Sequence, residues 1–197
     1  MANIPTLITT SGIRPVGHGW IPHVALVQDR EWVGEFNAIA GWTVLGNDTL
    51  NHGVQDGHIL GTHALVFDKV DGAANTIFAG LQCTLTSMDL SRFVAHDEFE
   101  TAIFVSSVAT ITYAFIRLGT DVSNYNEWRI PDTELTAGVW AILTKNLAAC
   151  QTTVVGTGWN SAAVTYLSIG VAFDAETDAL ADMAFDHLFL GTAQRTI

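Results

Sequence analysis

Seven segments that are typical of β-strands, separated by short turn sequences, limit the folds that this chain can adopt. Each is rich in Val, Ile, Thr, Phe or Tyr, the residues that fit a pleated sheet. The segments are residues 63–70, 75–86, 100–119, 126–130, 138–147, 161–174 and 184–191. Turn sequences such as VDGAAN, GTDVSN and GTGWNS lie between them. Short strands that alternate with turns predict an antiparallel all-β sandwich.

Two features refine this prediction. The segment at 100–119 is long and apolar on both faces, so we expect a bulge or a break near Ser106 and Ser107. The segments that favour helix are DLSRF (89–93) and DAETDALA (174–181). Both are short, and each is expected to form a single helical turn over a sheet edge.

Residues 1–35 differ in composition from the rest of the chain. They hold three of the four prolines and several glycines, with short apolar pieces between them. This composition predicts an extended N-terminal arm, followed by the sandwich at residues 36–197. Such an arm cannot bury its apolar side chains on itself, so we expect a neighbouring molecule in an assembly to cover them. The arm residues concerned are Ile4, Leu7, Ile8, Trp20, Ile21 and Val24.

Composition and charge exclude several classes of partner. Of the 197 residues 49% are hydrophobic, and 8 basic residues face 20 acidic ones for a net charge of −12. Duplex nucleic acid requires a basic surface, and an acidic surface repels anionic membranes. No apolar segment is long enough for a membrane span, and the N-terminus lacks the features of a signal peptide, so we expect synthesis in a cytoplasm. Cys83 and Cys150 do not form a disulfide or zinc pattern.

The segment AFDHLFL at 184–190 places a carboxylate among apolar residues. In a regular strand Asp186 would share one face with Ala184, Leu188 and Leu190, because side chains alternate. A carboxylate removed from water is costly unless it is hydrogen-bonded, paired or bound to a metal. Asp186 is therefore expected to have partners from another part of the fold.

The order of the segments resembles that of jelly-roll proteins of the carbohydrate-binding-module type. The resemblance covers residues 36–191 and starts from Phe36, Asn37, Gly41 and Trp42. The pieces that follow are GTHALVFDK, MDLSRF, WRIPDTELTAGVW, GTGWNSAAVTYLSIGVAF and MAFDHLFL. The resemblance implies a two-sheet jelly-roll β-sandwich in which the last strand carries an Asp.

The resemblance also implies a candidate metal site and a candidate ligand site. Asp186, Asn37 and Glu35 are the candidate ligands of a structural calcium, with Asp56 or Thr62 from a nearby loop. We favour the alternative that Asp186 accepts hydrogen bonds from the backbone of a neighbouring loop. Sugar-binding jelly rolls stack pyranose rings on aromatic side chains, and the candidates here are Tyr125, Trp128, Trp140 and Trp159. Packing in the core is the alternative for these aromatic residues.

Two functions are compatible with these features. The first is a structural protein of a tailed-phage virion, a capsid decoration or head-associated protein made in the host cytoplasm. Its arm would bind the major capsid protein or another virion protein, and the resemblance suggests a homo-oligomer, with a trimer as first guess. The second is a glycan-binding adhesion module with a structural calcium. Catalysis is not expected, because the chain has no G-x-S-x-G motif, no zinc-type His spacing and no carboxylate pair that can be assigned.

Overall fold

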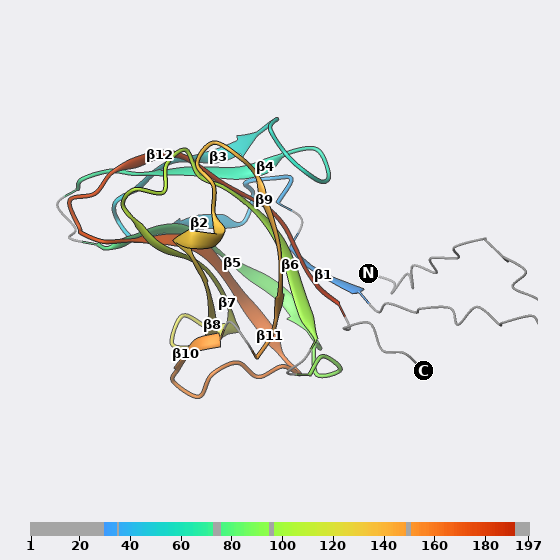
Figure 1. Ribbon diagram of the computed structural model, residues 1–197. Coiled ribbons are helices and arrows are strands. Elements are labelled where there is room, and N and C mark those ends of the chain that lie inside the picture. The colour runs from blue at the N-terminus through green and yellow to red at the C-terminus, as the bar shows by residue number, and fades with distance from the viewer. Residues whose placement is uncertain (1–29, 35, 73–75, 95–96, 149–150, 192–197) are drawn as a thin grey trace, which may run out of the picture.

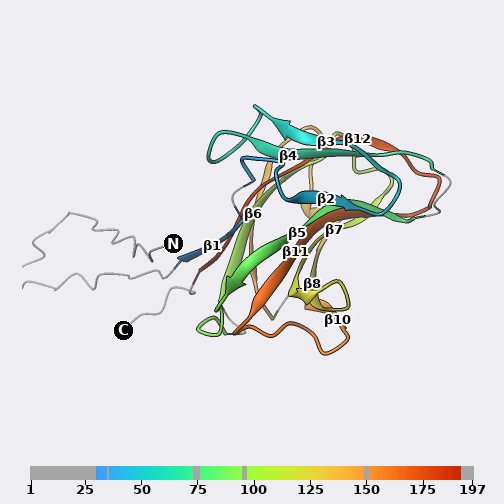
Figure 2. The ribbon, with the colours of Figure 1, turned by 180° about the vertical axis from the view of Figure 1, so that it is seen from behind.

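The computed structural model describes residues 30–34, 36–72, 76–94, 97–148 and 151–191. These residues form two antiparallel β-sheets packed face to face, as Figure 1 shows from one side and Figure 2 from the other. The predicted jelly-roll β-sandwich is confirmed. Residues 1–29 and Glu35 lie outside the described residues, and with them all six apolar residues of the predicted arm.

The first sheet is built around the last strand of the chain. Its strands, in spatial order, are β3 (Thr49–Gln55), β4 (Ala64–Lys69), β12 (Leu180–Gly191), β6 (Glu98–Phe104) and β9 (Ala141–Asn146). Strand β1 (Arg30–Gly34) also pairs with β12. One edge of β12 is therefore shared, because β4 pairs with its first half and β1 with its end.

The second sheet has three long strands side by side at its centre. In spatial order it consists of β10 (Gln151–Val155), β8 (Asn124–Pro131), β7 (Ile111–Asp121), β11 (Val164–Phe173), β5 (Phe78–Met88) and β2 (Trp42–Leu45). A 3-10 turn, η1 (Asp132–Glu134), follows β8. Figures 1 and 2 show that β5, β7 and β11 bend along their length, so the sheet is curved.

The core lies between the two sheets and follows the alternation of side chains along the strands. Ile116 of β7, Leu167 of β11 and Phe185 of β12 are examples of its fully buried members. Trp128 of β8 belongs to the same cluster with 1% of its surface exposed, and its indole N–H donates to the carbonyl of Leu147 at 2.6 Å. Burial of apolar surface on this scale is the main stabilising contribution to such a fold.

Several local predictions can be compared with the structure. The break near Ser106 is confirmed, because β6 ends at Phe104 and β7 begins at Ile111. The arm boundary requires correction, because Arg30–Gly34 is a strand of the first sheet. The sandwich therefore begins by Arg30 rather than at residue 36. The sequence also did not show β2, β3 and β10, which are short or polar.

Neither predicted helical turn is a helix: each segment forms a single hydrogen-bonded turn, from the Phe93 N–H to the Leu90 carbonyl and from the Asp178 N–H to the Ala175 carbonyl. At 89–93 the Asp89 carboxylate accepts hydrogen bonds from the backbone and the hydroxyl of Ser91. At 174–181 the ammonium group of Lys69 binds the carbonyls of Glu176 and Asp178, each at 2.7 Å. No helix in the described part of the chain is long and apolar enough to cross a membrane.

Lys69 is buried, with 1% of its surface exposed, and its removal gives a test of this account. Lys69→Met keeps most of the apolar volume but leaves the partly buried carbonyls of Glu176 and Asp178 without their charged donor. We expect a loss of about 2–4 kcal/mol in the free energy of unfolding, measured by urea denaturation. The matched control is Lys145→Met, which removes a surface ion pair with Glu134 and is expected to cost less than about 1 kcal/mol. Equal losses in the two variants would contradict the proposed role of Lys69.

Candidate functional site

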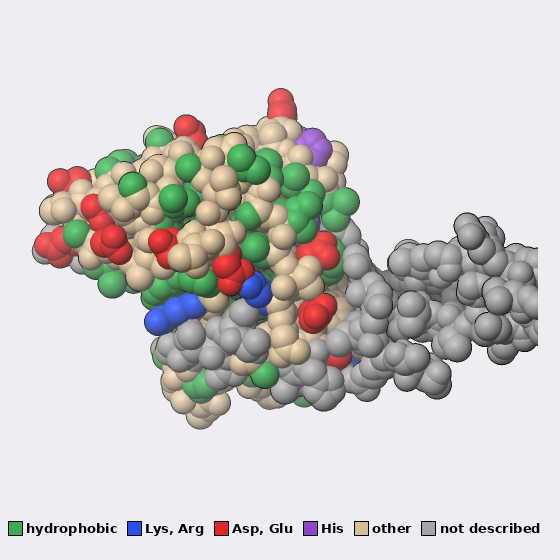
Figure 3. All heavy atoms as spheres, in the orientation of Figure 1, with side chains coloured by type: hydrophobic (Ala, Val, Ile, Leu, Met, Phe, Trp, Pro, Cys, Tyr) green, Lys and Arg blue, Asp and Glu red, His purple; other side chains and the backbone are tan. Residues whose placement is uncertain are grey.

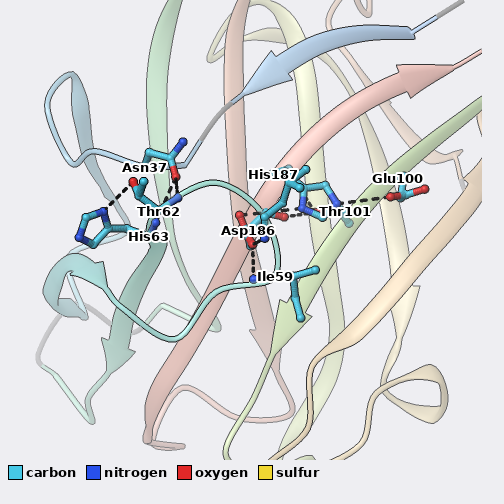
Figure 4. A network of polar contacts seen from close by, with 9 residues as sticks. Asn37, Ile59, Thr62, His63, Glu100, Thr101, Asp186 and His187 are labelled. Atoms are coloured by element: carbon cyan, nitrogen blue, oxygen red, sulfur yellow. Dashed lines mark hydrogen bonds and ion pairs between the residues drawn. The ribbon is translucent and has the colours of Figure 1, made fainter. Parts of the chain in front are cut away.

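Asp186 lies where the shared edge of β12 changes partner. The ladder shifts between Asp186 and Leu188, and His187 has a φ of +38°, a left-handed conformation. This bulge brings both Phe185 and Leu188 into the core, so the regular alternation expected from the sequence is interrupted. On the edge that β4 and β1 share, no strand pairs with Asp186, and a loop lies there instead. Asp186 accepts the backbone N–H groups of Ile59 and Leu60 in this loop, both at 2.6 Å (Figure 4).

Asn37 holds the other end of the same loop. Its side-chain oxygen accepts the backbone N–H groups of Thr62 at 2.8 Å and His63 at 3.1 Å. Gly61 fits against Asn37 in a left-handed conformation, and a Cβ at this position would lie 2.4 Å from the Asn37 oxygen. Two polar side chains therefore fasten the loop that fills the gap beside β12, as Figure 4 shows.

His187 lies on the other side of Asp186. Its ring is 3.9 Å from the Asp186 carboxylate and 3.6 Å from that of Glu100, and it stacks on Phe189 with ring centroids 5.1 Å apart. Burial alone would raise the pKa of Asp186. The His187 side chain and the backbone N–H groups of Leu60 and Ile59 outweigh this effect and lower the pKa below 3.8.

These contacts bear on the predicted calcium site. The Asp186 and Asn37 oxygens that would bind a cation accept backbone N–H groups, which is the alternative considered in the sequence analysis. Within the described ranges, no group of three or more His, Cys, Asp or Glu side chains could hold a metal ion. Calcium binding by Asp186, Asn37 and Glu35 stays a prediction, because Glu35 lies outside those ranges. We assign the Asp186 network a structural role.

A second group of polar residues covers the outward face of the second sheet. We call it the tyrosine–arginine face. It consists of Gln82 (β5), Tyr113, Phe115 and Arg117 (β7), Tyr125, Glu127 and Arg129 (β8) and Tyr166 (β11). The neighbours of these residues along the strands, such as Ile116, Trp128 and Leu167, point into the core. All three tyrosines of the chain lie on this one face.

The face lies in the bend of the curved sheet. Figure 3 shows a hollow below the lobe at the upper left, with Lys or Arg atoms at its edge. Register places the residues in rows across the strands, with Phe115 beside Arg129 and Arg117 beside Glu127. Gly170 is required in the neighbouring strand, because a Cβ there would lie 2.4 Å from the Phe115 ring. The sheet is thus shaped so that large side chains lie flat on it.

Glu127 organises the charges on this face. Its side chain is 3% exposed and accepts hydrogen bonds from Nε of Arg117 at 2.7 Å and Nε of Arg129 at 2.6 Å. A buried carboxylate requires such compensation. The result is two guanidinium groups held by one carboxylate.

The guanidinium groups also lie over aromatic rings. The Cζ atom of Arg117 is 4.1 Å from the centroid of Phe115 and 5.1 Å from that of Tyr125. The Cζ atom of Arg129 is 4.3 Å from the centroid of Tyr113. Cation–π contacts at these distances hold the side chains in place.

The tyrosine hydroxyls add further hydrogen-bonding groups. Tyr166 donates its hydroxyl to the Gln82 side-chain oxygen at 3.2 Å, and its ring is 6.0 Å from that of Tyr125. Burial raises the pKa of Tyr113, and the Glu127 carboxylate adds to this increase. Burial also raises the pKa of Tyr166. Both hydroxyls therefore remain protonated and can donate hydrogen bonds over an ordinary pH range.

The structure separates the aromatic residues that the sequence suggested for stacking. Tyr125 is partly exposed on the tyrosine–arginine face. Trp128 is corrected to a core residue, because its other contacts are with Phe99 and Trp159 between the sheets. Trp159 packs against this core from the side, with ring centroids 5.3 Å apart.

Most residues of this face were not predicted from the sequence to be functional. Tyr113, Arg117 and Tyr166 lie in segments that were assigned as strands without a function. A signal was present, because Tyr-x-Phe-x-Arg in one strand and Tyr-x-Glu-x-Arg in the next place large polar groups on one side at a period of two. Trp140, the fourth stacking candidate, lies beside Phe104 of the first sheet, with centroids 5.8 Å apart.

Comparison with known structures identifies the fold. The chain is similar to a family 11 carbohydrate-binding module from Clostridium thermocellum, solved with a β-1,3-1,4-mixed-linked tetrasaccharide, at a TM-score of 0.58 and 10% identity over 85% of this chain and 98% of that one. It is similar to an exo-β-agarase, at a TM-score of 0.58 and 9% identity, over 84% of this chain and 25% of that one. It is also similar to a second agarase, at a TM-score of 0.53 and 9% identity over 85% of this chain and 25% of that one. No protein-family model and no curated protein sequence matches the chain. The likeness shows the carbohydrate-binding-module type of jelly roll.

The network around Asp186 predicts a specific dependence of stability on pH. Because its pKa is lowered, the ionised Asp186 stabilises the fold above its ordinary value of 3.8, and this contribution is lost as the pH falls through the lowered value. Asp186→Asn should cost about 1–3 kcal/mol near neutral pH, and the difference from the unchanged protein should shrink as the pH falls below 3.8. Urea denaturation at a series of pH values measures both, with Asp56→Asn at an exposed position as the control. A difference that stays constant with pH would show that the Asp186 charge contributes nothing.

Proposed function

We propose that the protein binds carbohydrate, without catalysis, on the tyrosine–arginine face. The observation that carries this proposal is that all three tyrosines lie on the outward face of one curved sheet, together with Arg117, Glu127 and Arg129. Sugars present both C–H faces and hydroxyl groups, so their recognition requires aromatic rings beside hydrogen-bonding groups. This face supplies both kinds of group within a few residues.

The face is also rigid, which favours binding over simple solvation. Glu127 holds both arginines, the arginines lie over Phe115 and Tyr113, and Tyr166 bonds to Gln82. Side chains that are already ordered lose little entropy when a ligand binds. Of the similar structures named above, one is a carbohydrate-binding module in complex with a tetrasaccharide and two are agarases, which supports the same proposal.

Binding is favoured over hydrolysis by the number of carboxylates. Glycosidases require two acidic groups across the scissile bond. In the central part of the face, Glu127 is the single carboxylate among the described residues, and it is occupied by two arginines. The virion role, with its capsid partner, trimer and virion location, stays a prediction, because residues 1–29 lie outside the described ranges and the similar structures named above are not virion proteins.

A binding panel tests the proposed function. We expect retardation in gels that contain one or more of a set of neutral and anionic polysaccharides, followed by titration calorimetry with the best oligosaccharide. Tyr125→Ala should weaken binding at least about tenfold, because it removes a partly exposed ring and a hydroxyl from the face. Trp140→Ala is the matched control, since this aromatic residue lies beside the other sheet. Equal effects of the two substitutions, or no retardation by any polysaccharide, would refute the proposal.

A further inference from the structure

The chemistry of the tyrosine–arginine face points to a particular class of glycan, and this inference rests on the proposed function. The whole protein has a net charge of −12. At the centre of this face, however, Arg117, Glu127 and Arg129 leave one net positive charge. Asp121 lies apart from them, at the tip of the β7–β8 hairpin. A positive centre on an acidic protein is a feature that binding of a neutral sugar does not require.

The arginines also change what the aromatic rings can offer. The guanidinium of Arg117 lies 4.1 Å from the Phe115 centroid, and that of Arg129 lies 4.3 Å from the Tyr113 centroid. A ring face that is covered by a guanidinium cannot stack on a sugar at the same time. On these two rings the ligand therefore meets a cation in place of an aromatic surface.

Access differs between the two arginines. The side chain of Arg117 is 12% exposed, whereas that of Arg129 is 36% exposed. Glu127 fixes both by their Nε atoms, so each planar group is held in one orientation. A planar guanidinium in a fixed orientation matches the geometry of a carboxylate or a sulfate. Arg129 is thus the residue placed to meet an acidic group of a ligand.

We infer that the ligand of this face is an anionic glycan, whose uronate carboxylate or sulfate ester binds Arg129. The sugar ring that carries the acidic group lies toward Tyr125, the partly exposed tyrosine of the same strand, two rows away. Arg117 stays beneath the ligand as the second positive charge. The hydroxyls of Tyr113 and Tyr125, which are partly exposed, and the Gln82 side chain bind the hydroxyls of the glycan.

Matched pairs of ligands test this inference. The first pair is oligogalacturonate and its methyl ester, which differ in the carboxylate charge. The second pair is a sulfated galactan oligosaccharide and its desulfated form. We expect one acidic member to bind at least about tenfold more tightly than its neutral partner in titration calorimetry, because a charged hydrogen-bonded pair is lost in the neutral form. The pair that shows the difference identifies the acidic group.

Substitution of Arg129 tests the assigned residue. Arg129→Gln should reduce binding of the acidic member at least about tenfold and change binding of the neutral member less than about threefold. Arg129→Lys keeps the charge without the planar group and should give an intermediate loss. Arg92→Gln is the matched control, because Arg92 also pairs with a glutamate, Glu31, and lies over an aromatic ring, Phe93, away from this face.

The possible outcomes separate this inference from the proposed function. Preference for an acidic member that is lost in Arg129→Gln, with folding verified by circular dichroism, supports both. Equal binding of acidic and neutral members, or a loss for both ligands alike in Arg129→Gln, overturns the anionic assignment but leaves carbohydrate binding in place. If Arg129→Gln does not fold, Arg129→Lys decides by the same comparison. Failure of every polysaccharide to bind refutes both.

Discussion

The ladder of the first sheet depends on how β12 is interrupted at Asp186. A strand that pairs with β4, β1 and β6 leaves a gap where one partner ends and the next begins. Backbone groups in such a gap must be satisfied. The Thr101 hydroxyl donates to the His187 carbonyl at 2.8 Å. Asp186 and Asn37 hold a loop beside the gap by accepting its backbone N–H groups. The carboxylate among apolar residues is therefore part of how the sheet closes.

The second sheet shows a different use of a buried carboxylate. Glu127 does not connect distant parts of the chain; its partners are Arg117 on the neighbouring strand and Arg129 two residues away. These hydrogen bonds act locally and fix the positions of the two arginine side chains on the sheet surface. Phe115 lies flat under Arg117 because Gly170 leaves room for its ring. The absence of a Cβ at Gly170 in the sheet therefore determines how Phe115 lies on the sheet surface.

The sequence predicted the fold better than the site, for a physical reason. Long apolar strands such as β7 and β11 follow from residue type and turns alone, because their burial requires it. The segments at 89–93 and 174–181 form single hydrogen-bonded turns rather than helical turns, and at the second segment Lys69 from a distant strand binds the carbonyls, which local propensity does not include. Short strands at the sheet edges, such as β2 with 4 residues and β10 with 5, are too short to show a clear alternation of side chains.

The site was only partly predictable for another reason. Tyr125 could be identified as an exposed aromatic residue, but its grouping with Tyr113 and Tyr166 depends on which strands become neighbours. In the sheet β8, β7 and β11 are adjacent, although β11 follows β8 after more than thirty residues. Register then decides that Arg117 meets Glu127. Strand order and register depend on contacts between residues far apart in the sequence, and the residue pattern of a single strand does not contain this information.

The energetics of this cluster favour recognition over stability as the reason for it. Replacing a buried arginine–glutamate group by apolar residues of similar volume is often neutral or stabilising, because the charges must be desolvated. The core behind this face is already filled by apolar residues such as Ile116 and Leu167, so the sandwich does not depend on the charges for its packing. A chain that places Glu127, two arginines and every tyrosine on one face gains little stability from doing so. What it gains is a rigid polar surface, and such a surface suits the carbohydrate binding that we propose, because ordered side chains lose little entropy when a ligand binds.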